Sequence, residues 1–268
     1  MTALLLQQQQ VSLGVSPPIP PIPPTVKKKF TVWNGTRFNT SRPTIGDVAA
    51  AVYALLPTGI WDEVELLVKA GEGGTWQAAW DPHPLALSNS ADLAKLVSDA
   101  AQYHLTITPY VIVRGRAEWL PQEQAMIRAC CTIANRCILN LEPGTPYWNG
   151  PNDPNFIRNN YLKPIGVPPT KLQLCAIPRL TQINELGGVP CINAWTDPTY
   201  VGSASWECYG MIAPLLRVDV AIPNLDKWGV TPGWQYRIPT TQRGERETWA
   251  NTEWCEHGME IWYLDGDI

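Results

Sequence analysis

Val64-Glu65-Leu66-Leu67-Val68-Lys69-Ala70 is the stretch of this 268-residue chain that best indicates its fold. Leu66, Leu67 and Val68 form a continuous apolar run, which is typical of a strand buried on both faces of a parallel sheet. The preceding residues 45–56 carry apolar side chains at helical spacing. A strand at residues 30–33 comes before that helix, so the chain is predicted to begin with a β-α-β unit.

The same alternation continues through the rest of the chain. Further strands are expected at residues 105–113, 137–141, 172–177, 234–238 and 259–264, with helices beginning at the Ser90 cap and at Pro121. The sixth strand is either residues 191–195 or residues 206–210. About eight such units in about 240 residues favour an α/β fold of the (β/α)8 TIM-like barrel type. The alternative, an open doubly wound sheet, usually carries a glycine-rich phosphate loop, and the sequence contains no such motif.

Residues 1–29 differ in composition from the barrel domain expected at residues 30–268. They contain four consecutive glutamines and the proline-rich run 16–24, which favours an extended polyproline II conformation. This arm is either a disordered tail or a strap that packs along its own domain or a neighbouring subunit. Ile19 and Ile22 are three residues apart and would share one face of such a strap.

Composition narrows the classes of function. The net charge of −4 argues against a general nucleic-acid-binding protein. No segment approaches the ~20 apolar residues of a membrane span, and the N-terminus does not resemble a signal peptide. The seven cysteines form no CxxC pair and the three histidines are scattered, so we expect reduced core cysteines, no metal site and no cofactor. The localisation therefore stays open, and export would need a route other than a signal peptide.

The best candidate for chemistry is Glu142, because function in such barrels collects at the C-terminal ends of the strands. Asn140 and Glu142 are two residues apart on a strand and therefore point to the same side. Tyr147 and Trp148 follow and could form a stacking wall for a sugar. A carboxyl group beside aromatic walls suits glycoside hydrolysis, in which one acid protonates the leaving oxygen and a second carboxylate assists.

That second carboxylate has three candidates, and each has a structural alternative. Glu72 lies in a glycine-rich turn, where it is either a ligand contact or a solvated residue. Glu207 lies near the sixth strand and is either functional or structural, and Asp265, after the last strand, is either an inward-facing strand-end group or part of a frayed tail. Glu142 could itself be a strand-end carboxylate that pairs with Arg114 or Lys69. The residues predicted to bind substrate are Asn34, Asn140, Tyr147, Trp148 and Trp195.

Four short motifs resemble glycoside hydrolase family 25, the lysozyme-like barrels. Residues 64–73 are similar to the second strand of that family with its Lys-Ala-x-Glu-Gly turn, and residues 105–110 resemble the third strand. Asn140-Leu141-Glu142 stands where the family has Asp-x-Glu, and residues 261–265 resemble the last strand of related barrels, many of them encoded by phages. The resemblance covers roughly residues 30–145 and the C-terminus.

The resemblance implies a barrel with Glu142 as general acid, acting on a polysaccharide such as cell-wall peptidoglycan. Two positions depart from the family pattern, because Asn34 and Asn140 stand where the family carries Asp. An amide cannot act as a general base or nucleophile. The alternative is therefore a catalytically inactive barrel that serves as a carbohydrate-binding or assembly subunit, for example of a phage particle, with residues 1–29 contacting a protein partner.

Overall fold

The computed structural model describes residues 29–33, 37–54, 63–144, 147–207, 224–225, 227–230, 237–240 and 260–264. Asn34, Asp265 and residues 1–28 of the expected arm lie outside these ranges, and for Glu207 only the backbone is described. The predicted boundary between the arm and the barrel domain therefore stays a prediction.

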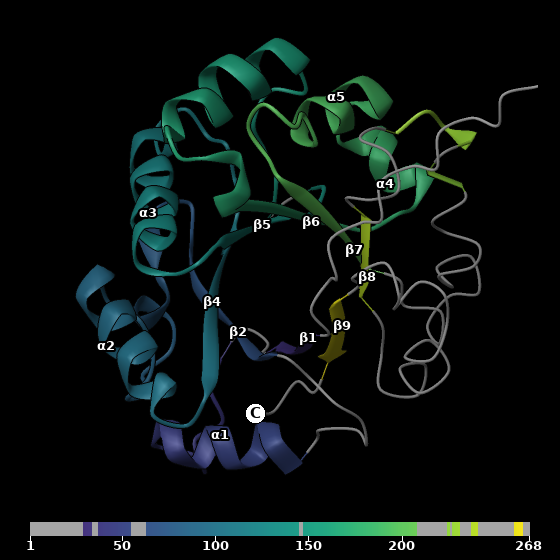
Figure 1. Cartoon of the computed structure of the whole chain (residues 1–268). Coiled ribbons are helices and arrows are strands. Elements are labelled where there is room, and N and C mark those ends of the chain that lie inside the picture. The colour runs from purple at the N-terminus through teal and green to yellow at the C-terminus, as the bar shows by residue number, and fades with distance from the viewer. Residues whose placement is uncertain are drawn as a thin grey trace, which may run out of the picture.

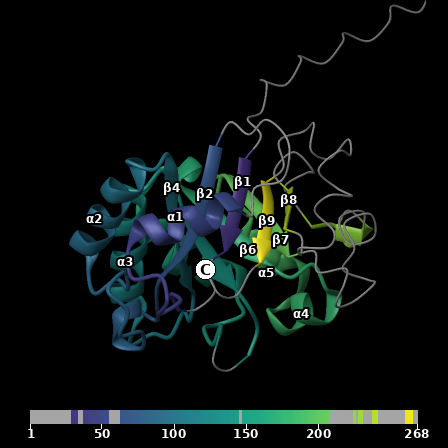
Figure 2. The ribbon, with the colours of Figure 1, turned by 90° about the horizontal axis from the view of Figure 1, so that it is seen from below.

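One curled parallel sheet forms the centre of the fold (Figures 1 and 2). Its strand order is β8-β7-β6-β5-β4-β2-β1-β9. The strands are β1 (Lys29–Trp33), β2 (Glu63–Glu72), β4 (Leu105–Ile112), β5 (Cys137–Leu141), β6 (Leu172–Ala176), β7 (Ser203–Glu207), β8 (Arg237–Thr240) and β9 (Glu260–Leu264). A short strand, β3 (Thr75–Trp76), pairs antiparallel with β2.

The sheet confirms the predicted α/β class and the parallel pairing. Its two edge strands, β8 and β9, come close together, but the described residues contain no ladder that joins them. Closure into a complete eight-stranded barrel therefore remains a prediction.

The helices lie on the convex outer side of the sheet, as Figure 1 shows. They are α1 (Ile45–Ala54), α2 (Ser90–Ala101), α3 (Leu120–Ile133), α4 (Leu180–Glu185) and α5 (Gly188–Trp195), with the short turns η1 (Gln77–Ala79), η3 (Lys163–Ile165) and η4 (Pro169–Lys171) and the π-helix η2 (Phe156–Leu162). The cap of α2 is Asn89, one residue before the predicted Ser90, because its side chain accepts hydrogen bonds from the N–H groups of Ala91 and Asp92.

The predicted strand at residues 191–195 is wrong, because this segment is helix α5. Gly187 takes a left-handed conformation just before the helix, and Pro190 fits its first turn. Cys191, Ile192 and Trp195 are buried at helical spacing. A short apolar run cannot be assigned to helix or strand from its pattern alone. The sixth strand of the prediction is instead β7, which starts three residues before the alternative at residue 206.

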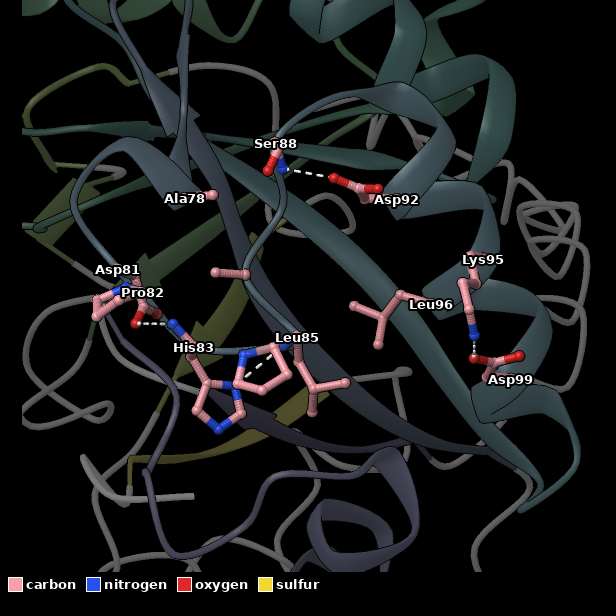
Figure 3. A pocket seen from close by; sticks show the side chains of 12 residues that line it. Ala78, Asp81, Pro82, His83, Leu85, Ser88, Asp92, Lys95, Leu96 and Asp99 are labelled. Atoms are coloured by element: carbon pink, nitrogen blue, oxygen red, sulfur yellow. Dashed lines mark hydrogen bonds and ion pairs between the residues drawn. The ribbon is translucent and has the colours of Figure 1, made fainter.

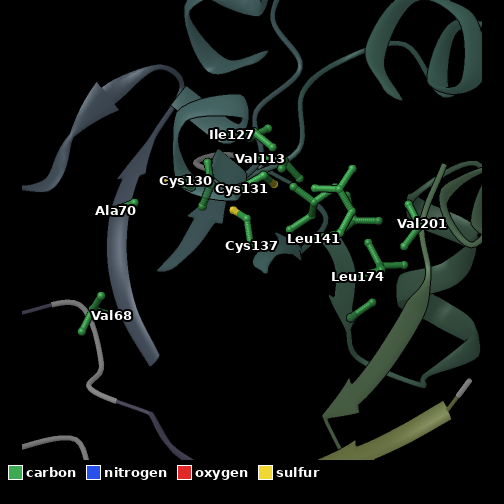
Figure 4. Close-up of a cluster of buried hydrophobic side chains, with 14 of the residues drawn as sticks. Val68, Ala70, Val113, Ile127, Cys130, Cys131, Cys137, Leu141, Leu174 and Val201 are labelled. Atoms are coloured by element: carbon green, nitrogen blue, oxygen red, sulfur yellow. The ribbon is translucent and has the colours of Figure 1, made fainter. Parts of the chain in front are cut away.

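The main core lies between the sheet and the helices and contains several free thiols. Cys130, Cys131 and Cys137 are buried close to one another (Figure 4), and burial raises the pKa of the Cys137 thiol. The expectation of reduced core cysteines is confirmed for the five cysteines in the described residues. Here a thiol packs as a small apolar side chain.

The concave side of the sheet is filled in layers, as in a (β/α) barrel. The middle layer is apolar and consists of Leu67, Tyr110, Ile112, Ile138 and Cys175. Below it, towards the N-terminal ends of the strands, the interior is polar. Above it, at the C-terminal ends, lies the edge at which a site is expected.

The lower layer is centred on Glu65, whose side chain is 1% exposed. Its carboxylate accepts hydrogen bonds from Thr31 Oγ1 at 2.9 Å and from Thr108 Oγ1. Arg136 Nη2 donates to Glu65 Oε2 at 2.6 Å, so the buried charge is paired. These contacts link β1, β2 and β4 to the segment that leads into β5.

We predict that Glu65→Ala lowers the free energy of unfolding by about 3–5 kcal/mol, because it leaves the charge of Arg136 buried and unpaired. Urea denaturation followed by circular dichroism measures the change. Glu118→Ala is the control; its carboxylate is 61% exposed and 4.0 Å from Arg116, and its loss should cost less than about 1 kcal/mol. Equal effects of the two variants would contradict a central role for Glu65.

Candidate functional site

A β-bulge at the end of β2 places Glu72 on the concave side of the sheet. Lys69 pairs in register with Tyr110, whereas Gly71 pairs with Val111 and Glu72 with Ile112, so Ala70 is the extra residue. Without the bulge, Lys69 and Glu72 would point to opposite faces. With it, both side chains lie on the side of Tyr110, at the C-terminal edge of the sheet.

Glu72 is held by two cations. Lys69 Nζ lies 2.8 Å from Glu72 Oε2, and Arg114 Nη2 donates to Glu72 Oε1. Burial alone would raise the pKa of Glu72, but the two cations outweigh it and lower the pKa below its ordinary value of 4.5. Lys69 and Arg114, the partners considered for Glu142, therefore pair with Glu72 instead. Glu72 is also not a solvated turn residue.

The loop that carries Arg114 is fixed by Glu123, a buried carboxylate on α3 that the sequence did not single out. Its Oε2 and Oε1 accept hydrogen bonds from the N–H groups of Arg114 and Gly115 at 3.0 and 3.2 Å, and Tyr161 donates its hydroxyl to Oε1. Burial raises the pKa of Glu123 in spite of these bonds. The sequence does contain one indication of such a role for Glu123, because it lies two residues after Pro121, in the first turn of a predicted helix.

Asn140 and Glu142 point to the same side, as their spacing predicted. Asn140 Nδ2 donates to Glu142 Oε1 at 3.1 Å. The Asn140 side chain is 7% exposed, and its Oδ1 is buried without a hydrogen-bond partner among the described residues. A buried acceptor without a donor is costly, so this position favours a ligand group that can donate an N–H or O–H.

The backbones of Glu142 and Arg114 are tied together by the loop after β5. Trp148 N donates to the carbonyl of Glu142 and Asn149 N to the carbonyl of Arg114, each at 2.9 Å. In register, Glu72 lies beside Ile112, and Ile112 beside Asn140. Two strand spacings of about 4.8 Å therefore separate the backbones of Glu72 and Asn140 by roughly 10 Å. The carboxylates of Glu72 and Glu142 thus belong to one edge of the sheet.

Of the two residues of the predicted stacking wall, Tyr147 and Trp148, only Tyr147 lies at this edge. It is half-buried and packs against the apolar middle layer, as does Trp33 at the end of β1. The rings of Trp33 and Tyr110 lie 6.0 Å apart. Trp33 was not singled out from the sequence, although its position as the last residue of the first strand could have indicated it.

Trp148 of the predicted stacking wall and Trp195, predicted to bind substrate, are packed inside the protein. They are 4% and 0% exposed, and their rings meet edge to face at 4.9 Å. Tyr161 completes the cluster, and Gly115 and Gly150 lie against the indole of Trp148. In this arrangement the two tryptophans support the loop that carries Tyr147.

The described residues also contain a cavity of about 440 Å³ away from the strand ends. It lies between the segment 78–88 and α2, and Figure 3 shows Asp92, Lys95, Leu96 and Asp99 on the helix side. Asp81, on the other side, accepts hydrogen bonds from the N–H groups of Phe38 and His83. Most of the polar side chains around this cavity thus already pair with one another or with backbone groups.

The described residues contain neither a cluster of metal-binding side chains nor a membrane-spanning helix. None of their His, Cys, Asp and Glu side chains gather in a group that could hold a metal ion. No helix in the described ranges has the length and apolar character needed to cross a membrane.

No protein-family model matches the chain, and no curated protein sequence matches it significantly. Among solved structures, one match is the C-terminal domain of a putative chitinase from Desulfitobacterium hafniense, with 14% identity and a TM-score of 0.49 over 81% of this chain and 66% of that chain. Another is from the tandem GH20 catalytic modules of the pneumococcal exo-β-D-N-acetylglucosaminidase StrH, with 11% identity and a TM-score of 0.31 over 81% of this chain and 59% of that one. The chain thus spans less than two thirds of each, and no residue role carries over at this level.

We predict that Glu72→Gln weakens the dependence of stability on acid. The folded-state pKa of Glu72 is lowered, so its ionised form stabilises the fold above about pH 4.5, and this contribution is lost as the pH falls through the folded-state pKa. The variant should be less stable at neutral pH but lose less stability between roughly pH 5 and pH 3. Thermal unfolding across this range tests the prediction, with Glu118→Gln as control; identical acid profiles for wild type and Glu72→Gln would contradict it.

The bulge itself leaves no room for a side chain at Gly71. A Cβ on Gly71 would lie 2.1 Å from the Thr75 carbonyl oxygen and 2.9 Å from Met126 Cε, so Gly71→Ala should destabilise the protein by about 1–3 kcal/mol. Gly46→Ala is the matched control in α1, where the nearest atom is the hydroxyl end of exposed Tyr103. We expect that control to be neutral or slightly stabilising in urea denaturation.

Proposed function

We propose that this chain is a carbohydrate-active barrel that binds a polysaccharide at the C-terminal ends of β2 and β5 and hydrolyses it with Glu142 as general acid. The observation that carries the proposal is the hydrogen-bonded pair of Asn140 and Glu142 beside Tyr147. It combines a carboxyl group, a buried acceptor without a donor and an aromatic ring at one edge. Sugar rings offer hydroxyl donors on their edges and apolar C–H faces for aromatic contact.

In this proposal each group has a separate role. Glu142 protonates the leaving glycosidic oxygen, Asn140 Oδ1 accepts a hydroxyl or acetamido N–H of the sugar, and Tyr147 covers one face of the ring. The chain would close into a full barrel of the lysozyme-like family 25 type, and cell-wall peptidoglycan is the first substrate to test. Asn34, the residue that follows β1 in the sequence, would add a further polar contact.

Glu72 is the second carboxylate with the best support, because it lies on the same edge. Its lowered pKa keeps it ionised near neutral pH, so it is the carboxylate on β2 that could assist Glu142. The backbones of Glu72 and Asn140 are separated by two strand spacings, roughly 10 Å, so Glu72 and Glu142 would face a sugar from two different strands. Glu207 and Asp265 stay as alternative proposals for this role.

A second candidate function is carbohydrate binding without hydrolysis, either alone or within an assembly such as a phage particle. The observation that favours it is the pairing of Glu72 with both Lys69 and Arg114. A carboxylate held by two cations is a weak base and a weak nucleophile. The presence of Asn140 where family 25 has Asp points the same way, and residues 1–29 would then contact a protein partner.

We predict that Glu142→Gln lowers the release of reducing ends from purified peptidoglycan by about 10²–10⁴-fold, because the amide cannot donate the proton. Cosedimentation with the same peptidoglycan should be retained, since the variant keeps the shape of the side chain. Glu185→Gln, an exposed carboxylate at the end of α4, is the control and should keep wild-type activity.

The outcomes separate the two functions. Wild-type protein that binds peptidoglycan but releases no reducing ends would favour the binding candidate. Wild-type protein that neither binds nor cleaves a panel of polysaccharides would contradict both.

A further inference from the structure

Trp80 is an exposed aromatic residue at the edge where the site lies. Among the described large hydrophobic side chains, the exposed ones are Trp80, Tyr103 and Leu180. Trp80 follows the η1 turn and is 39% exposed. An exposed indole ring loses little by being covered and gains from contact with a flat apolar surface.

The position of Trp80 follows from its contact with Lys69. Lys69 Nζ lies 5.4 Å from the centre of the Trp80 ring and 2.8 Å from Glu72 Oε2. Since Lys69 pairs in register with Tyr110 of the middle layer, its side chain belongs to the concave side of the sheet. The ring of Trp80 therefore stands next to the ion-paired cluster of Lys69, Glu72 and Arg114.

This arrangement combines the two features that a sugar requires. The indole offers an apolar face, and the neighbouring cluster offers hydrogen-bond donors on Lys69 and Arg114 and an acceptor on Glu72. The cluster is partly buried, with side chains 9%, 12% and 19% exposed for Lys69, Arg114 and Glu72. Its geometry is fixed by the bulge at Ala70 and, through Arg114, by Glu123.

We propose that Trp80, with Lys69 and Glu72, forms a distinct pyranose-binding subsite on the β2 side of the mouth, next to the position of Asn140 and Glu142. The sugar would stack its C–H face on the indole and direct adjacent hydroxyls at Lys69 and Glu72. This inference rests on the proposed function and deepens it, because a polysaccharide would then occupy at least two positions along the edge.

The test compares Trp80→Phe with Trp80→Leu in the full chain. Phenylalanine keeps a flat ring, whereas leucine keeps only an apolar cover over the stem of Lys69. Cosedimentation with purified peptidoglycan should weaken at least about tenfold in Kd for Trp80→Leu and stay within about threefold of wild type for Trp80→Phe. Tyr103→Leu is the control, because Tyr103 is 43% exposed but lies just before the N-terminal end of β4.

Each outcome decides one question. Wild-type affinity in Trp80→Leu, with binding by the wild type intact, would overturn the subsite and leave the proposed function in place. Failure of the wild type to bind would overturn both. Weakened binding in Trp80→Leu with an unchanged thermal midpoint supports the subsite, and an equal loss of affinity in Trp80→Phe and Trp80→Leu would overturn stacking as its cause.

Discussion

A buried ion pair between Glu65 and Arg136 lies beneath the apolar layer of the parallel sheet and holds its strands together. The carboxylate of Glu65 accepts hydrogen bonds from β1 and β4 and pairs with Arg136 at the entrance to β5. A charge in this position is tolerated only when its partners are fixed. The contacts of Glu65 therefore fix β1, β2, β4 and β5 relative to one another near their N-terminal ends. Because the strands are parallel, their C-terminal ends lie at one common edge of the sheet.

At that edge a single extra residue decides which side chains meet. The bulge at Ala70 turns Glu72 towards the concave side, where Lys69 and Arg114 hold it. Glu123 fixes the backbone of Arg114, and the loop after β5 ties that backbone to Glu142. The candidate site is therefore one connected network, in which Lys69 and Arg114 hold Glu72 in its ionised form.

The aromatic residues are divided between the edge of the sheet and the core. Of the aromatic residues predicted to bind substrate, Tyr147 lies at the edge, whereas Trp148 and Trp195 pack inside. Trp33 and Trp80 reach the edge instead, one from the end of β1 and the other from the turn after β3. A high tryptophan content is compatible with both a heavy core and aromatic side chains at a binding edge, and here tryptophans occur both in the core and at the C-terminal edge of the sheet.

The parallel α/β sheet could be predicted from the sequence alone, because continuous apolar strands alternate with amphipathic helices. The sequence also determined the shared direction of Asn140 and Glu142, since side chains two apart on a strand point to one side. Only the tertiary structure decided that residues 191–195 form a helix, that Glu72 faces Lys69 and Arg114, and that Trp148 is buried. Those outcomes depend on a bulge and on contacts between segments distant in sequence, and local periodicity carries no information about either.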